Sequence, residues 1–306
     1  MKSSLRQIAA ACLLVAMLPI AGSAISGKQA SGGAKSAPAF DDGSTLPHIA
    51  EGRIDWNKTE SGNCLVAKDS FGFTACPRGV PNGFWNVALI GDSHMRQYFA
   101  DLDYLARKYN WRLTYISKSA CPVGTQAMLP SHLSASCRDW NGHLESYLAA
   151  HPAFNLIINS NSAFVSHASP EVAAAYRSLV KSQLRRGTAW FAIWDNPKPR
   201  KDFLSCIAIQ GDMARKRCSL SYEQSMRPLD VLPAAIQGFS NVTTLDLRSK
   251  FCPADLCSPI INGIVVYRDK SHISNAFSRT LVGYLDAAIP QRFRRDPQYP
   301  ILNLGR

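Results

Sequence analysis

The stretch Asn86-Val87-Ala88-Leu89-Ile90-Gly91-Asp92-Ser93-His94 joins an apolar run to a tight polar turn. The run predicts a buried strand over residues 86–90, and the side chains that follow have helical spacing over residues 94–108. A serine on a strand-to-helix turn is exposed and lies at the positive end of the helix. Most Asp-Ser turns are simple helix caps, so the turn identifies no active site by itself.

The same alternation of apolar strands and helices continues along the chain. Strands that alternate with helices form βαβ units and a parallel sheet. Strands this apolar are buried on both sides, so we expect an α/β fold in which helices cover both faces of a mostly parallel, five-stranded sheet. The further predicted strands are 112–117, 155–159, 189–194 and 242–247, and the further helices are 139–150, 170–186, 227–239 and 274–289.

Polar residues follow three of the predicted strands. Gly91-Asp92-Ser93-His94 follows the first strand, Asn159-Ser160-Asn161-Ser162 follows the third, and Asp195 follows the fourth. The carboxyl ends of parallel strands meet at one edge of a sheet, where the active sites of such folds lie. The side chains expected to line a pocket beside Ser93 are Asp92, His94, Asn159 and Asp195.

A second motif, Asp269-Lys270-Ser271-His272, lies just before the last predicted helix. A serine hydroxyl becomes a good nucleophile only when a base takes its proton, and a carboxylate on the other nitrogen of that base fixes its tautomer. Asp269 precedes His272 by one short turn, which suits this arrangement. We therefore predict a catalytic triad of Ser93 as nucleophile, His272 as general base and Asp269 as the group that orients the imidazole.

Acyl transfer through a triad also requires hydrogen-bond donors for an oxyanion. The backbone N–H of Ser93 is one expected donor. The candidates for a second donor are the backbone N–H of Gly124, after the second strand, and the side-chain amide of Asn161 or Asn159, after the third. Ordinary turn formation also accounts for the glycine and for both asparagines, so the sequence leaves this donor open.

The N-terminus has the pattern of an export signal. Lys2 and Arg6 precede an apolar run, and the small residues that follow it are typical of a cleavage site. Export places the protein in the periplasm or outside the cell. The predicted organisation is a signal peptide over 1–24 (or an uncleaved membrane anchor over 8–27), a disordered linker over 25–50, a folded domain over 51–295 and a C-terminal tail over 296–306.

Eight of the nine cysteines lie in the predicted domain, and Cys12 lies in the signal. An even number of cysteines in an exported chain predicts disulfides, and sequential pairing is favoured because each bridge then closes one loop. A zinc site is the rival interpretation. No Cys-x-x-Cys occurs and no histidine pair has finger spacing, so neither a metal nor a cofactor is expected. The expected disulfides are Cys64–Cys76, Cys121–Cys137, Cys206–Cys218 and Cys252–Cys257.

The chain carries a formal net charge of +12. Charge of this size suits nucleic acid, but an exported, disulfide-bonded protein rarely meets it. An anionic glycan or lipid head group is the favoured partner, and a solvated basic face explains the charge equally well. We therefore expect no nucleic-acid partner.

Further motifs accompany the turn and the triad. They are Ser119-Ala120-Cys121-Pro122, Trp194-Asp195-Asn196-Pro197, and Cys252-Pro253-Ala254-Asp255-Leu256-Cys257 ahead of Tyr267 to His272. Together with residues 87–94, they resemble the SGNH hydrolase superfamily, and in particular the SGNH domains fused to membrane acyltransferases of the acyltransferase-3 type. The resemblance extends over about residues 60–290. It implies a periplasmic, flavodoxin-like three-layer α/β/α domain in which Ser93, Asp269 and His272 occupy the triad positions.

The resemblance also implies O-acylation of bacterial surface glycans such as lipopolysaccharide, exopolysaccharide or peptidoglycan. We therefore expect a serine-dependent O-acyltransferase or acylesterase that acts on O-acyl, chiefly O-acetyl, groups. The sequence contains one apolar segment in place of the many-helix membrane domain, so transfer would need a separate membrane acyltransferase partner or a soluble acyl donor, and a hydrolytic role is the remaining alternative. The usual Gly-x-Asn-Asp block is replaced by Asn159-Ser160-Asn161-Ser162. The alternative function is a non-catalytic glycan-binding module whose aromatic side chains, Trp140, Trp190, Trp194 and Tyr267, stack on sugars.

Overall fold

The computed structural model describes residues 64–163, 169–199, 203–225 and 230–295, all within one compact unit of the chain. The predicted signal peptide or anchor, the linker and the C-terminal tail lie outside the described residues. Within the ranges that the structure describes, every helix is too short or too polar to cross a membrane.

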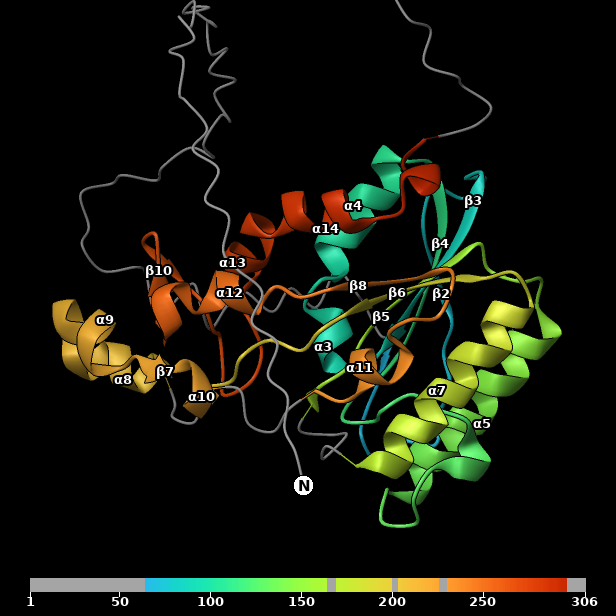
Figure 1. Ribbon diagram of the computed structural model, residues 1–306, viewed down its shortest axis with the longest axis horizontal. Helices are drawn as coiled ribbons and strands as arrows, with labels where there is room; N and C mark the ends of the chain where they lie inside the picture. Colours follow the sequence, from blue (N-terminus) through green and yellow to red (C-terminus); the bar gives the residue numbers. More distant parts are fainter. Residues whose placement is uncertain (1–63, 164–168, 200–202, 226–229, 296–306) are drawn as a thin grey trace, which may run out of the picture. The chain divides into compact units, whose positions relative to one another are not determined.

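A seven-stranded sheet forms the centre of the fold, and six of its strands follow the order β1-β4-β3-β5-β6-β8 (Figure 1). All five predicted strands are present and run parallel to one another. Numbered along the chain, these five have the spatial order 2-1-3-4-5 of flavodoxin-like folds. The sheet is wider than predicted by β1, which pairs parallel with β4, and β2, which pairs antiparallel with it. The strands are β1 (Leu65–Val66), β2 (Cys76–Gly79), β3 (Trp85–Gly91), β4 (Trp111–Lys118), β5 (Leu156–Ser160), β6 (Ala189–Ile193) and β8 (Val242–Leu245).

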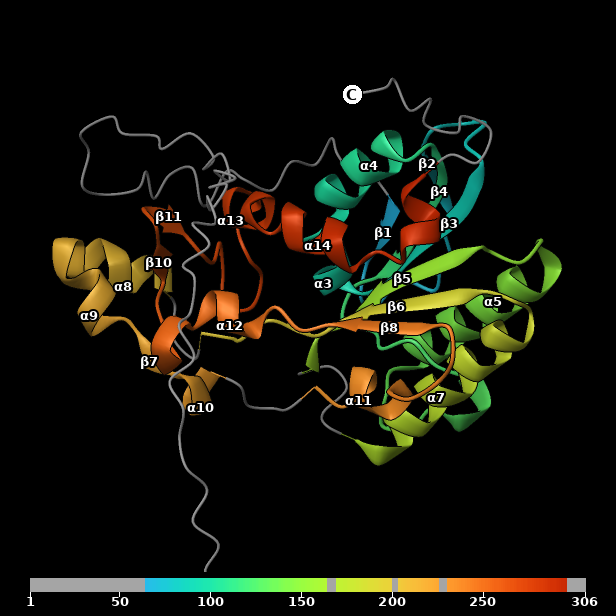
Figure 2. The same cartoon turned by 45° about the horizontal axis from the view of Figure 1, so that its top comes forward.

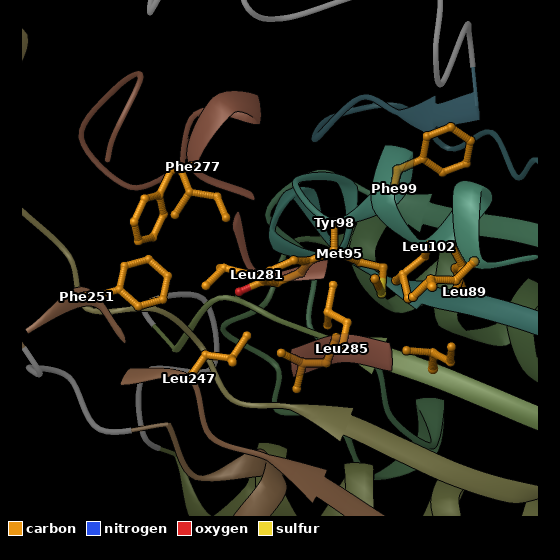
Figure 3. Close-up of a cluster of buried hydrophobic side chains, with 14 of the residues drawn as sticks. Leu89, Met95, Tyr98, Phe99, Leu102, Leu247, Phe251, Phe277, Leu281 and Leu285 are labelled. Carbon is orange, nitrogen blue, oxygen red and sulfur yellow. The ribbon is translucent and has the colours of Figure 1, made fainter. Parts of the chain in front are cut away.

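Helices cover both faces of this sheet, which gives the three layers (Figures 1 and 2). Successive strand residues face opposite sides, so Val87 and Leu89 belong to one hydrophobic cluster, and Ala88 and Ile90 to the other. Figure 3 shows part of the first cluster, where buried side chains from β3, α4 and α14 gather. The first face carries α3 (Ser93–Arg96), α4 (Phe99–Lys108), α13 (Asn275–Thr280) and α14 (Val282–Ala288), and the second carries α5 (Ala135–Ala150), α7 (Pro170–Arg185) and α11 (Leu232–Ile236).

Several predicted helices have different bounds in the structure. The helix expected over 94–108 is divided into α3 and α4, and the one expected over 274–289 is divided into α13 and α14. Helix α5 begins earlier than predicted because the Ser134 side chain caps it, accepting a hydrogen bond from the Cys137 N–H. Helix α7 begins as predicted, with Ser169 as its cap and Pro170 in its first turn.

Apart from α11 and β8, the residues between β6 and α13 form an accessory region that the sequence patterns did not predict in detail. It contains two small antiparallel pairs, β7 with β9 and β10 with β11. All four expected disulfides are present with the predicted sequential pairing, and two of them lie in this region. Its elements are α8 (Phe203–Gln210), α9 (Ala214–Arg217), β7 (Leu220–Ser221), α10 (Tyr222–Ser225), α12 (Arg248–Phe251), β9 (Leu256–Cys257), β10 (Ile260–Ile261) and β11 (Ile264–Val265).

Candidate active site

Ser93 lies where β3 passes into α3, at the carboxyl edge of the sheet. Gly91 ends the strand so close to β5 that a Cβ atom on it would lie 2.1 Å from the carbonyl oxygen of Ser160. Asp92 is extended and caps α3, with its Oδ1 accepting the N–H of His94 at 2.8 Å. Ser93 is therefore the first helical residue, at the helix end where backbone N–H groups point outward. The strand order reverses between β3 and β5, so this turn lies at the switch point where such sheets bind ligands.

The structure brings the three predicted triad residues together. Ser93 Oγ lies 2.8 Å from His272 Nε2. Asp269 places Oδ2 at 2.8 Å and Oδ1 at 3.0 Å from His272 Nδ1. In the neutral imidazole, a carboxylate on Nδ1 fixes the proton on that nitrogen, so Nε2 accepts the Ser93 hydroxyl hydrogen.

Hydrogen bonds of the buried Gln97 side chain connect the loop that carries His272 to helix α3, which begins at Ser93. Gln97, four residues after Ser93, accepts the N–H of Ile273 at 3.1 Å through Oε1. Its Nε2 donates to Asn196 Oδ1 at 2.8 Å, and Asn196 Nδ2 donates to the Ser271 carbonyl at 3.1 Å. The residues on either side of His272 are thus held by one connected set of hydrogen bonds, which fixes the imidazole relative to the serine.

Asp269 is held as a carboxylate by its surroundings. Burial by itself would raise its pKa, but hydrogen bonds from the His272 ring and from the N–H groups of Ser271 and His272 outweigh burial and bring the pKa well below its usual range. Arg268 adds a cation, with Nε 3.7 Å from Oδ2. The negative charge beside His272 therefore persists at neutral pH and stabilises the imidazolium that forms when the histidine takes a proton.

A second Asp–His pair lies beside the triad. His94 is buried, its ring centroid is 4.9 Å from that of His272, and its Nδ1 lies 2.5 Å from Asp195 Oδ1. Asp195 also accepts the Ala163 N–H at 2.7 Å and pairs with Lys198 at 3.1 Å. Burial lowers the pKa of His94 to about 4, and Lys198 adds to this effect against the opposing charge of Asp195. His94 is therefore neutral at pH 7 and donates its Nδ1–H to an ionised Asp195.

Two further carboxyl groups are buried behind the turn. Burial raises the pKa of Asp92 to about 7, with a contribution from Asp195 and against two backbone N–H groups that bind the carboxylate. One of these N–H groups belongs to Ser162, 3.0 Å from Asp92 Oδ2, and joins the loop after β5 to the serine turn. Burial likewise raises the pKa of Asp230 to about 7, again with Asp195 nearby. These groups titrate near neutrality because each must ionise away from water.

The predicted pocket residues occupy the interior instead of an open surface. Asp92, His94, Asn159 and Asp195 are each at most 2% exposed. Their polar atoms are used by neighbouring loops, as described for Asp92 and Asp195. They therefore support the turn from behind, and their contribution to a pocket lining stays a prediction.

The oxyanion candidates have different environments. Gly124 is not available, because its N–H donates to Asn141 Oδ1 at 2.9 Å and a Cβ on it would lie 2.9 Å from Ala175. Its backbone packs against α7, so the prediction that the Gly124 N–H serves as an oxyanion donor is wrong. Asn161 Nδ2 makes a single long contact, 3.4 Å to the Cys121 carbonyl, which leaves its second amide hydrogen unused among the described residues. Asn159 holds Asn161 from the side, donating to its Oδ1 at 3.0 Å.

Comparison with known proteins identifies the family of this chain. The profile of the SGNH domain that is fused to AT3 domains matches residues 63–287. The chain belongs to this family. The search of curated proteins found no sequence match to this chain.

One solved structure gives the fold of this SGNH domain independent support. The periplasmic domain of a lipopolysaccharide acetyltransferase of Salmonella ser. Paratyphi A aligns with a TM-score of 0.54 and 12% identity, over 82% of this chain and 98% of that one. A carbohydrate acetylesterase family member from Sinorhizobium meliloti aligns with a TM-score of 0.38 and 13% identity, over 67% and 99%. The first of these matches confirms the predicted α/β fold class.

The sequence did not identify all the residues around the triad of this SGNH domain. Gln97 lies one helical turn after Ser93, but a buried glutamine has no distinguishing sequence pattern. Asn196 lies in a quoted motif, and Lys198, which follows that motif directly, has a side chain that is only 12% exposed. A lysine three residues after the strand-edge Asp195 is the signal that marks this ion pair.

Proposed function

We propose that this SGNH domain is a serine-dependent enzyme that transfers or hydrolyses O-acyl groups, chiefly O-acetyl groups, of bacterial surface glycans. The observation that carries the proposal is the 2.8 Å distance between Ser93 Oγ and His272 Nε2. A serine so close to an unprotonated imidazole nitrogen has its general base in place before substrate binds. The family relationship supports acyl chemistry.

In the proposed first step, Ser93 Oγ attacks the acyl carbonyl carbon while its proton passes to His272 Nε2. The imidazolium is stabilised by the Asp269 carboxylate and donates the proton to the departing oxygen, which leaves as an alcohol. The acyl group is then esterified to Ser93. In the second step, a glycan hydroxyl or a water molecule gives its proton to His272 and attacks this ester, and Ser93 is regenerated.

The tetrahedral intermediates of both steps require donors at their oxyanion. We assign the Ser93 N–H, at the start of α3, and the unused Nδ2–H of Asn161. The register supports this pair, because Gly91 lies opposite Ser160 in neighbouring strands. Two residues beyond Gly91 and one beyond Ser160, Ser93 and Asn161 leave the sheet side by side. Each donor of this kind typically contributes about 10²–10³-fold to kcat.

The family and the charge of the chain support the proposed substrate and partner. The related SGNH domains are fused to AT3 domains, so we propose that a separate membrane acyltransferase supplies the acyl group. The net charge of +12 suits an anionic glycan or a membrane surface. Four disulfides suit an oxidising compartment, in line with an exported domain.

The proposal is tested with the purified protein, p-nitrophenyl acetate as acetyl donor and mass spectrometry of the intact chain. We expect ester cleavage and an acetyl group on the peptide that contains Ser93, and neither in Ser93→Ala. Adding an acetyl-free surface polysaccharide separates transfer, which acetylates the glycan, from hydrolysis, which releases acetate alone. Unchanged turnover in Ser93→Ala would refute the proposal.

The alternative of a non-catalytic glycan-binding module receives little support from the aromatic side chains proposed for it. Trp140, Trp190 and Tyr267 are at most 1% exposed, so their rings are covered by the core. Trp194 is half-buried, and the guanidinium of Arg248 covers its ring at 4.6 Å. Three of the four rings are therefore unavailable to a sugar, and the fourth has a cation over one face.

A further inference from the structure

Four buried polar side chains form a hydrogen-bonded chain that leads to Asn161. Trp190 Nε1, on β6, donates to the Tyr176 hydroxyl at 2.9 Å. Tyr176, on α7, donates to Asn159 Oδ1 at 2.9 Å. Asn159 Nδ2 donates to Asn161 Oδ1 at 3.0 Å and to the Ile90 carbonyl at 2.6 Å. All four side chains are at most 3% exposed.

The direction of this chain is fixed at its first member. An indole N–H only donates, so the Tyr176 oxygen accepts from Trp190 and uses its own hydrogen on Asn159. Asn159 must then present Oδ1 to Tyr176, which turns its amide hydrogens toward Ile90 and Asn161. Asn161 consequently presents Oδ1 to Asn159 and directs Nδ2 away from it. An amide that is otherwise free to exchange its O and N by a half-turn has one orientation here.

This orientation matters because the two ends of the Asn161 amide have opposite effects on an oxyanion. An N–H stabilises the negative charge, whereas a carbonyl oxygen in the same place repels it. The loop position is fixed separately, since the next residue, Ser162, donates its N–H to Asp92 Oδ2 at 3.0 Å. The hydrogen-bonded chain therefore contributes the rotation of the amide, which the backbone leaves undetermined.

We propose that Tyr176 and Trp190 are positioning residues that set the Asn161 amide with its N–H toward the Ser93 oxyanion. The inference rests on the proposed function. It assigns a role in the reaction to side chains that come from the second face of the sheet and from the hydrophobic core. Neither residue touches the substrate, and both act through Asn159 on the amide of Asn161.

A double-mutant cycle tests this assignment with the full chain and p-nitrophenyl acetate. Asn161→Ala is expected to lower kcat about 100-fold, as for other oxyanion donors. Tyr176→Phe keeps the ring and removes only the hydroxyl, and we expect kcat about 10-fold lower at unchanged KM. In the Asn161→Ala background, Tyr176→Phe should change kcat less than twofold, because no amide remains to be oriented. Tyr115→Phe is the matched control, because it removes the hydroxyl of another fully buried tyrosine that takes no part in the hydrogen bonds leading to Asn161.

The outcomes separate the inference from the proposed function. Full activity in Ser93→Ala refutes the serine mechanism itself. Full activity in Asn161→Ala refutes the oxyanion assignment and the inference with it. If Asn161→Ala is impaired but Tyr176→Phe lowers kcat equally in both backgrounds, its effect is structural and the inference is wrong. Should Tyr176→Phe fail to fold, Trp190→Phe tests the same point, with a kcat loss expected only when Asn161 is present.

Discussion

Replacing Asp269 with asparagine isolates the contribution of the carboxylate charge to the triad. Asparagine keeps Oδ1 for the N–H groups of Ser271 and His272, each 2.8 Å away, and changes the group that faces His272 Nδ1. Over 2.8 Å, Coulomb's law gives about 6 kcal/mol at an effective dielectric constant of about 20 and about 1.5 kcal/mol in bulk water. The Asp269 side chain is 46% exposed, so an intermediate value of about 3 kcal/mol applies. At about 1.4 kcal/mol per tenfold, kcat/KM should fall about 100-fold.

The measurement is steady-state cleavage of p-nitrophenyl acetate by the purified variant, together with its thermal unfolding. Asp246→Asn is the matched control, because Asp246 has a similarly exposed side chain, 44%, and binds Arg248 instead of a histidine. We expect the control to retain its activity. A loss below about fivefold in Asp269→Asn, with kcat/KM measured on folded protein, would show that the carboxylate does not stabilise the imidazolium and would refute the reasoning.

Three further perturbations follow from the contacts described above. Replacing both Cys121 and Cys137 with serine removes a disulfide that spans 16 residues. Urea unfolding should then show a free energy of unfolding lower by about 3 kcal/mol, and an unchanged midpoint would contradict this. Gln97→Ala releases the histidine loop and should lower kcat/KM about 10-fold, the equivalent of one hydrogen bond to a positioned group; unaltered kinetics would exclude the fastening role. The pKa of Asp230 is raised from 3.8 to about 7, so the folded protein binds an extra proton there between these pH values, and the stabilisation this brings is lost as the pH rises through them. Asp230→Asn removes this loss, so between about pH 4 and 7 the stability of the variant should rise relative to the wild type, as measured by denaturant unfolding at each pH; parallel pH curves would count against the assignment.

The features that the sequence predicts correctly are those that depend on neighbouring residues in short segments. The run before Gly91 is apolar throughout because both faces of β3 are covered, and the same reasoning located all five parallel strands. Once those strands were placed, topology alone put Ser93 and Asn161 at one edge. The spacing of Asp269 and His272 reports a local turn, so the triad geometry also followed from the sequence.

The remainder depends on contacts between distant segments. Gln97 binds a loop more than 170 positions away, and nothing beside it in the sequence specifies that partner. Gly124 was a candidate for the oxyanion because it follows the second predicted strand, but its close neighbour is Ala175 of α7. Strands β1 and β2 escaped prediction because their few residues are stabilised by pairing with β4 and by the Cys64–Cys76 disulfide, and not by an apolar pattern of their own.

The connection between Ser93 and His272 spans 179 positions of the chain. During translation the nucleophile therefore leaves the ribosome long before the base that activates it, while domains generally acquire their structure as units. A nascent or truncated polypeptide that stops short of residue 272 has the alcohol but no imidazole to deprotonate it. Connectivity alone thus leaves every product of synthesis that ends before residue 272 without the base that its serine needs.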